Sequence, residues 1–200
     1  MTVEFHTADV FTDRPFGGNQ LAVLPDASGL TTEQMTNITR EFNFSESVFV
    51  LPPENPANAC RLRIFTPGAE LPFAGHPTVG AAFVLASIGV IDASADETRV
   101  IFEEGIGLVP VLIHSSNGRP VFTQLTAAKL PEHGSATYDA STIASVLSLE
   151  ADDLDVSAAY QIESWSAGVP FLFVPVTSRD ALVRARIHTE RWERALRDSW

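Results

Sequence analysis

The sequence is poor in cysteine, in basic residues and in long apolar runs, and each shortage excludes a class of protein. The single cysteine, Cys60, cannot form a disulfide within the chain or a cysteine-only metal cluster. Thirteen basic residues stand against 25 acidic ones, giving a net charge of −12, so we expect no binding to nucleic acid or to an anionic membrane surface. No apolar run reaches the roughly 18 residues of a transmembrane helix.

The beginning of the chain lacks the basic and apolar regions of a signal peptide, so we expect a cytoplasmic protein. The composition is that of a folded chain, because 45% of the residues are hydrophobic and 13 are phenylalanine, which is ample for a packed core. The length of 200 residues lies between one and two domains of about 150 residues each.

Strand and helix signals alternate along the first half of the chain. Thr31 and Gln34 have the spacing of a capping box, which predicts the start of a helix. Alternation in the last of the early strands places Cys60 on the same face as Leu62 and Ile64, which is typical of a core thiol. The expected elements are strands over residues 3–11, 20–25, 47–51 and 60–65 and a helix over residues 31–42.

A second helix is predicted over residues 77–88, with Pro77 at its first position and Gly89 just beyond its end. Its body carries no charged residue on any face. A helix of this kind is surrounded by protein on all sides, so we expect a central helix wrapped by strands.

The second half of the chain weakly repeats the first. Gly168, Phe171, Phe173 and Pro175 have the same spacing as Gly18, Leu21, Val23 and Pro25, and an amphipathic helix follows each set; duplication and coincidence both explain the match. The elements expected here are strands over residues 98–102, 108–114, 120–125, 159–162 and 171–176 and helices over 141–149 and 189–197. We expect a first lobe over residues 1–115 and an incomplete second lobe over residues 116–200 that lacks its central helix.

Glu46 is the first candidate for chemistry, because it follows a helix end and opens an apolar strand. Burial at this position disfavours the charged carboxylate relative to the protonated carboxyl group. A general acid-base that works near neutral pH needs this, because it must be able both to hold and to release a proton there. The alternative is a solvated glutamate at a strand edge.

Gly75 and His76 form the second candidate, at the start of the uncharged helix. Free N–H groups and the helix dipole favour a bound carboxylate or phosphate there, and His76 adds a proton-transfer group. The alternative is a histidine that caps the helix. The third candidate is the tight turn Gly17-Gly18-Asn19, whose amide side chain can bind a substrate; the alternative is a turn without a role in binding. The other histidines lack metal-ligand spacing, and no nucleotide-binding motif is present.

Four segments resemble the PhzF-like (phenazine-biosynthesis) isomerase family: residues 11–19 (FTDRPFGGN), 40–46 (REFNFSE), 63–67 (RIFTP) and 70–78 (ELPFAGHPT). The resemblance implies the diaminopimelate-epimerase-like α/β (α+β) fold. In that fold two pseudo-symmetric lobes each wrap a curved, mostly antiparallel sheet around a central helix, and the active site lies between them.

The resemblance also implies roles for single residues. Glu46 matches the catalytic glutamate that shuttles a proton between two substrate carbons, and His76 matches the histidine that binds the substrate. Further substrate contacts are implied for the neighbouring motif residues Gly18, Asn19, Ser45, Gly75, Pro77 and Thr78. Alanine replaces the cysteine of related thiol-based epimerases at Ala74, so the two-cysteine mechanism is excluded. The family further implies no metal or organic cofactor, a small carboxylate substrate and a homodimer.

The chain departs from the family in its second half. The expected Gly-Ser-Ala motif of the second lobe is missing, since Gly134-Ser135-Ala136 precedes Gly168 instead of following it. The chain also ends before the expected place. Three hypotheses follow: a truncated PhzF-like isomerase, inactive as these 200 residues alone; a non-catalytic ligand-binding or interaction protein derived from the fold; or an epimerase or dehydratase on the same fold.

Overall fold

The computed structural model describes residues 2–157 and 159–196, and the chain divides into two units, Met1–Lys129 and Leu130–Trp200. This division lies beyond the lobe boundary expected after residue 115. The reason is that a further strand, Arg119–Leu125, pairs with the strand before it and so belongs to the first unit.

One curved sheet and two helices make up the first unit. The helices are α1 (Thr32–Phe42) and α2 (Gly75–Ser87). The strands are β1 (His6–Val10), β2 (Asn19–Leu24), β3 (Glu46–Leu51), β4 (Cys60–Phe65), β5 (Glu70–Leu71), β6 (Glu97–Glu104), β7 (Gly107–Ser116) and β8 (Arg119–Leu125).

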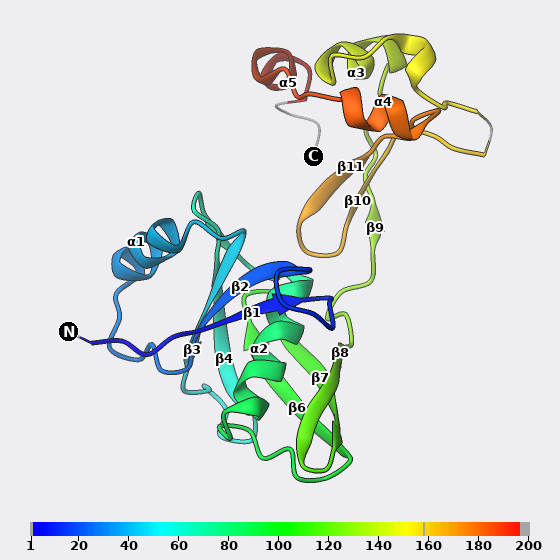
Figure 1. Ribbon diagram of the computed structural model, residues 1–200. Helices are drawn as coiled ribbons and strands as arrows, with labels where there is room; N and C mark the ends of the chain where they lie inside the picture. Colours follow the sequence, from blue (N-terminus) through cyan, green and yellow to red (C-terminus); the bar gives the residue numbers. More distant parts are fainter. Residues whose placement is uncertain (1, 158, 197–200) are drawn as a thin grey trace. The chain divides into compact units, whose positions relative to one another are not determined.

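The strands of the first unit follow the order β1-β2-β3-β4-β6-β7-β8, with β5 added beside β4. Only the β2–β3 and β4–β6 pairs are parallel; the other described pairs are antiparallel. The sheet curls around α2, as Figure 1 shows. This confirms the predicted fold class, a mixed α and β fold with a curved, mostly antiparallel sheet around a central helix.

The helix α2 packs its apolar body into the main core of the unit, where Ala81, Ala82 and Leu85 are fully buried. The prediction of protein on all sides is wrong at Phe83, which is 38% exposed. The described sheet ends at β1 on one side and β8 on the other, and Phe83 lies in a cavity of about 590 Å³ that both edge strands line.

The predicted start of α2 at Pro77 is also wrong, because the helix begins at Gly75 with Ala74 as its N-cap. Proline is tolerated at this third position for the same reason as at the first, since the N–H groups of the first helical turn have no partner within the helix.

The helix α1 starts as predicted: Thr31 accepts a hydrogen bond from the backbone N–H of Gln34, and the Gln34 side chain accepts one from Thr31. It lies on the other face of the sheet, where Met35 packs with Phe49 and Phe65 in a second core cluster (Figure 1).

The second unit is smaller and contains short elements around a core that includes Ile143, Leu149 and Leu154. Its elements are β9 (Glu132–His133), α3 (Ala140–Val146), the 3-10 turn η1 (Ala151–Asp153), β10 (Glu163–Ser166), β11 (Pro170–Phe173), α4 (Arg179–Arg184) and α5 (Thr189–Leu196). These strands form one three-stranded antiparallel sheet in the order β11-β10-β9.

Several predictions for the second unit are wrong in detail. The strand expected over residues 159–162 lies instead at β10, where small polar residues, Ser164 and Ser166, face the core and hide the apolar alternation. The helix expected over 141–149 ends at Val146, because Ser148 adopts a left-handed backbone conformation with φ of 58°. The helix expected over 189–197 is α5, and its last residue, Arg197, lies outside the described residues.

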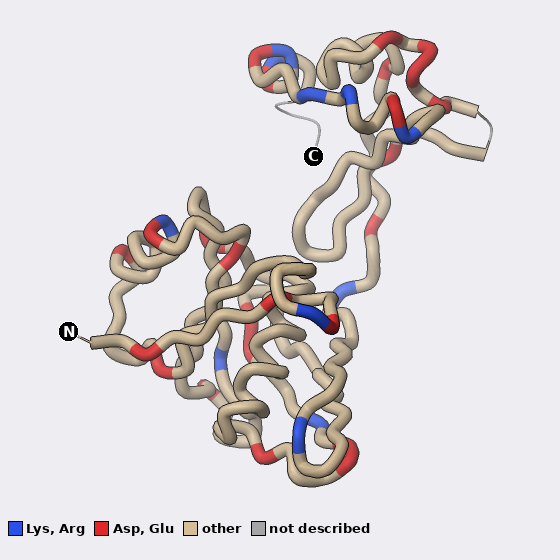
Figure 2. Tube along the Cα trace, viewed as in Figure 1, with Lys and Arg blue, Asp and Glu red and all other residues tan. Residues whose placement is uncertain are grey.

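Acidic residues occur along the trace of both units and the basic residues are interspersed among them (Figure 2). No helix in residues 2–157 and 159–196 is both long enough and apolar enough to cross a membrane.

Candidate active site

Two adjacent parallel strands bring the candidate polar residues together. In the β2–β3 pair, Leu21 lies opposite Glu46, so the residues that open the two strands are neighbours. The hydroxyl of Ser45 donates a hydrogen bond of 2.9 Å to Oδ1 of Asn19. The sequence places these two residues 26 positions apart, and only the parallel pairing joins them.

The end of α1 directs the chain into this position. Asn43 has a left-handed backbone conformation with φ of 52°, and its N–H donates to the carbonyl of Thr39. Asparagine tolerates this conformation better than most residues and ends helices in place of glycine. The chain then turns within two residues, and Glu46 opens β3.

His76 reaches the same place from the first turn of α2. Nδ2 of Asn19 lies 3.2 Å from Nδ1 of His76. Because Oδ1 of Asn19 accepts the Ser45 hydrogen bond, its amide nitrogen is the group that faces the imidazole and donates to it. This network assigns the proton of a neutral His76 ring to Nε2.

Nε2 of His76 lies 3.2 Å from Oε2 of Glu46, and the two side chains are only 9% and 17% exposed. The angles at these two atoms are not those of a hydrogen bond, and neither atom has a hydrogen-bond partner among the described residues. Two groups that can carry a proton therefore face each other in a largely buried place with unused hydrogen-bonding capacity. This arrangement can pass a proton to and from a bound molecule.

Burial lowers the pKa of His76 below its ordinary value, while the nearby Glu46 carboxylate and the backbone of Gln20 act in the opposite direction. Burial is the largest of these effects, so the ring is neutral near pH 7. A neutral imidazole is a weaker acid than imidazolium, and it can both donate and accept a proton in one cycle.

The other predicted site residues have different surroundings. A side chain at Gly18 would overlap the carbonyl oxygen of Val10, so the backbone approaches β1 more closely there than any other residue allows. A side chain at Gly75 would meet no heavy atom within 4 Å. Pro77 is buried in the helix packing, and the Thr78 hydroxyl is engaged with Ala74 and with a glutamate of β6. The roles of these residues in substrate binding remain predictions.

That glutamate, Glu104, is a buried polar residue that sequence reasoning missed. Glu104 stands between Glu103 and a Gly-Ile-Gly turn, and this pattern is typical of a solvent-exposed hairpin end. The alternation of the strand was the available signal, since Glu104 falls on the same face as Phe102, which is fully buried.

Cys60 is buried beside Leu62 and Ile64, as predicted for a core thiol. Burial raises the pKa of Cys60 to about 12, with Glu104 and Glu103 adding to the effect, so the thiol is not a nucleophile near neutral pH. Among the residues that the structure describes, no group of three or more His, Cys, Asp or Glu side chains is arranged to hold a metal ion.

Comparison with known proteins shows what the whole chain is similar to. The sequence model of the phenazine biosynthesis-like proteins (PhzC-PhzF) matches residues 8–200. An uncharacterised isomerase of Mesorhizobium japonicum is 41% identical over 184 residues, which are 92% of this chain and 59% of that protein. The trans-2,3-dihydro-3-hydroxyanthranilate isomerase of Pseudomonas fluorescens is 35% identical over 175 residues, 87% of this chain and 57% of that enzyme.

A solved structure is similar as well. The structure of a predicted epimerase of Pseudomonas aeruginosa superimposes with a TM-score of 0.84 at 35% identity, covering 99% of this chain and 67% of that one. The chain spans 59% of the length of the Mesorhizobium japonicum relative and 57% of that of the Pseudomonas fluorescens relative.

Proposed function

Because the chain belongs to the phenazine biosynthesis-like (PhzC-PhzF) family, we propose that it is part of an isomerase that moves a proton between two carbons of a small carboxylate substrate. The observation that carries this proposal is the pair formed by Glu46 and His76. Their facing atoms are buried, 3.2 Å apart and without hydrogen-bond partners among the described residues.

In this proposal Glu46 takes a proton from one substrate carbon and returns it to another. The electron pair released at the first carbon moves through the adjacent double bond, so that no external acceptor is needed. His76 donates a hydrogen bond from Nε2 to the substrate, and Asn19 holds the imidazole in that tautomer. Ser45 holds Asn19 in turn.

The substrate carboxylate is proposed to bind at the start of α2. This helix carries no acidic residue in its first turn, and its N-cap, Ala74, offers no side chain to the free N–H groups. The N–H groups of Gly75 and His76 therefore remain available, and the helix dipole favours an anion there. No metal or organic cofactor takes part in this scheme, and homodimerisation remains an expectation from the family.

The test is deuterium incorporation from solvent into a substrate by the full-length protein. The first probe is trans-2,3-dihydro-3-hydroxyanthranilate, after the name of the Pseudomonas fluorescens relative. Glu46→Gln keeps the size of the side chain and removes the proton carrier, so the exchange rate should fall by about 10²- to 10⁴-fold. The matched control is Glu41→Gln, which alters an exposed carboxylate on α1 and should leave the rate unchanged.

Unchanged exchange in Glu46→Gln would refute the proposed role of Glu46. The identity of the product separates the remaining hypotheses. A shifted double bond supports an isomerase, a stereoisomer of the probe supports an epimerase, and loss of water supports a dehydratase. Tight binding of the probe without exchange supports a ligand-binding protein.

A further inference from the structure

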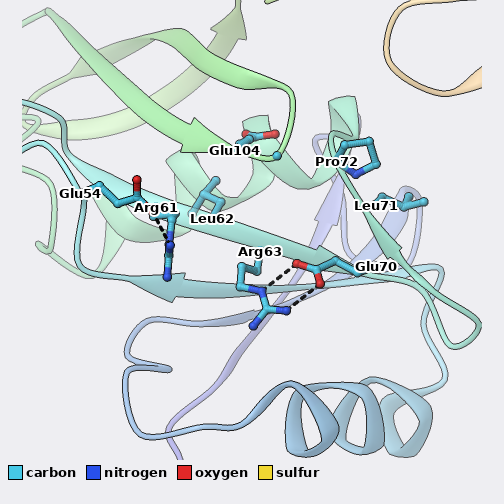
Figure 3. Close-up of a pocket in the computed structure, with 9 residues that line it drawn as sticks. Glu54, Arg61, Leu62, Arg63, Glu70, Leu71, Pro72 and Glu104 are labelled. Carbon is cyan, nitrogen blue, oxygen red and sulfur yellow. Dashed lines mark hydrogen bonds and ion pairs between the residues drawn. The ribbon is translucent and has the colours of Figure 1, made fainter.

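Glu104 is a buried carboxyl group that the proposed chemistry does not use. It ends β6, its residue is 8% exposed, and its Oε2 has no hydrogen-bond partner among the described residues. It also lines a cavity of about 610 Å³ between β4, β5 and β6, shown in Figure 3. An ionised carboxylate with a free oxygen in such a place is unfavourable, because burial removes its hydration.

The hydrogen bonds of Thr78 point to the protonation state of Glu104. Oγ1 of Thr78 lies 2.9 Å from the carbonyl oxygen of Ala74 and 2.8 Å from Oε1 of Glu104. A hydroxyl has one hydrogen, and both neighbours are acceptors if Glu104 is ionised. If Glu104 carries a proton, it donates to Thr78, and Thr78 donates to Ala74, so that both contacts become hydrogen bonds.

The surrounding charged groups do not offset a charge on Glu104. Arg61 donates to Glu54 at 2.7 Å, and Arg63 makes a two-bond pair with Glu70 at 2.7 and 2.6 Å (Figure 3). The charged groups that line the cavity with Glu104 are Glu54, Arg61, Arg63 and Glu70. Of the other titratable groups, Glu103 precedes Glu104 on β6, Cys60 lies on β4, His76 on α2 and His114 on β7. Burial raises the pKa of Glu104 to about 7, against the smaller opposing effect of the Thr78 hydrogen bond.

We infer that Glu104 is a positioning residue whose neutral form holds the first turn of α2 through Thr78, and that loss of its proton loosens the turn that carries His76. The inference rests on the proposed function only for the role of His76 in the reaction. When Glu104 ionises, the Thr78 hydroxyl turns to the carboxylate, and the carbonyl of Ala74 loses its side-chain donor. Among the described residues, that carbonyl then keeps the 3.2 Å bond from the N–H of Thr78.

The consequence for the site follows from the position of Ala74. It is the N-cap of α2 and has no side-chain hydrogen bond of its own. The bond from the Thr78 hydroxyl to the Ala74 carbonyl therefore helps to fix the first turn, beside the backbone bond from the Thr78 N–H, and His76 lies between Ala74 and Thr78 in the chain. The conformation of His76, and with it the contact to Glu46, becomes dependent on pH.

The test is a pH titration of the full-length protein by NMR, with ¹³C-labelled glutamate carboxyls and ¹⁵N-labelled histidine. We expect the Glu104 carboxyl to titrate with a midpoint of about 7 and the His76 backbone amide to shift with the same midpoint. In Glu104→Gln the shift of His76 at this midpoint should disappear, because the amide of glutamine donates to Thr78 at every pH.

Two variants of Thr78 separate coupling from folding. Thr78→Val removes the hydroxyl with little change in volume, so Glu104 should still titrate but His76 should no longer follow it. Thr78→Ser keeps the hydroxyl and should keep the coupled shift. A shift of His76 near pH 7 that persists in Glu104→Gln or in Thr78→Val overturns the inference. None of these measurements needs turnover, so the inference can fail while the role of Glu46 stands, and the reverse.

Discussion

The buried carboxyl of Glu104 makes the stability of the first unit dependent on pH, with a sign opposite to that of an ordinary carboxylate. Its pKa in the folded protein is about 7, above the ordinary value of 4.5. Between these two values the folded chain holds a proton that the unfolded chain has released. By linkage, this contribution to stability is fully present below pH 4.5 and is lost as the pH rises toward 7.

The size of the effect follows from the two pKa values. Each pH unit over which only the folded state holds the proton costs about 1.4 kcal/mol, so the full loss for Glu104 is about 3 kcal/mol. Glu104→Gln has no proton to lose. Relative to the unmodified chain, the variant should therefore gain stability by about 2 kcal/mol between pH 5.5 and pH 7.5.

The neighbouring Glu103→Gln is the matched control. Glu103 accepts hydrogen bonds from the backbone N–H groups of Asn55 and Glu54 and from the Asn58 side chain, and these contacts lower its pKa. Its contribution to stability is present above its unfolded pKa and is lost as the pH falls. Glu103→Gln should therefore leave the slope of stability against pH unchanged between pH 5.5 and pH 7.5, and should remove a loss of stability only below pH 4.5.

The assay needs a probe of the first unit. All tryptophan and tyrosine residues belong to the second unit: Tyr138, Tyr160, Trp165, Trp192 and Trp200. Fluorescence therefore reports the second unit, and urea unfolding of the first unit should be followed by the exchange of buried α2 amides. If the stability curves of Glu104→Gln and of the unmodified chain run parallel from pH 5.5 to 7.5, the reasoning about Glu104 is refuted.

Two further predictions test the geometry of the site. Gly18→Ala should destabilise the first unit by about 2 kcal/mol or more in urea unfolding, because its methyl group would overlap the Val10 carbonyl. The methyl group of Gly75→Ala meets open space, so this variant should change stability by less than about 1 kcal/mol. Asn19→Leu removes the donor to Nδ1 of His76, so the ¹⁵N shifts of the ring should change from the Nε2–H tautomer to a mixture; unchanged shifts would contradict the assigned network.

The sequence predicts those features of the first unit that depend on residues close together in the chain. The capping box at Thr31 starts α1, and the alternation around Cys60 gives the buried face of β4. The absence of charge on α2 predicts a central helix, but not the opening at Phe83, which depends on where the two edge strands of the sheet lie. Such long-range placement has no local signal.

The second unit was harder to predict for a physical reason. Its core faces include small polar residues such as Ser164, and its helices end at residues without the usual glycine, as at Ser148. The helix α4 was missed although Ser178 caps it by accepting from the N–H of Ala181, because only six residues follow the cap. Short elements leave too few residues for a periodicity to be visible.

The candidate site shows the same division between local and long-range information. The sequence marks Glu46 and His76 as unusual by their neighbours. The hydrogen bond from Ser45 to Asn19 arises from the parallel pairing of β2 and β3, and the contact of Asn19 with His76 arises from the packing of α2 against the sheet. The resemblance to the family assigns these residues to one site, but it predicts neither the strand pairing nor the hydrogen bonds that bring them together. The Thr78–Glu104 contact joins a motif residue to one outside every motif, and so only the structure reveals it.

The state of Glu104 also bears on the charge at the start of α2. A buried helix without an acidic first turn keeps the positive end of its dipole unneutralised. An ionised Glu104, which contacts Thr78 from β6, would supply a competing negative charge next to that first turn, whereas a neutral Glu104 supplies none. Protonation of this single carboxyl therefore acts twice on the proposed site: it fixes the turn that carries His76, and it leaves the helix end free to attract the substrate carboxylate. We expect the affinity for an anionic probe to fall as the pH rises through about 7, and Glu104→Gln to remove this dependence.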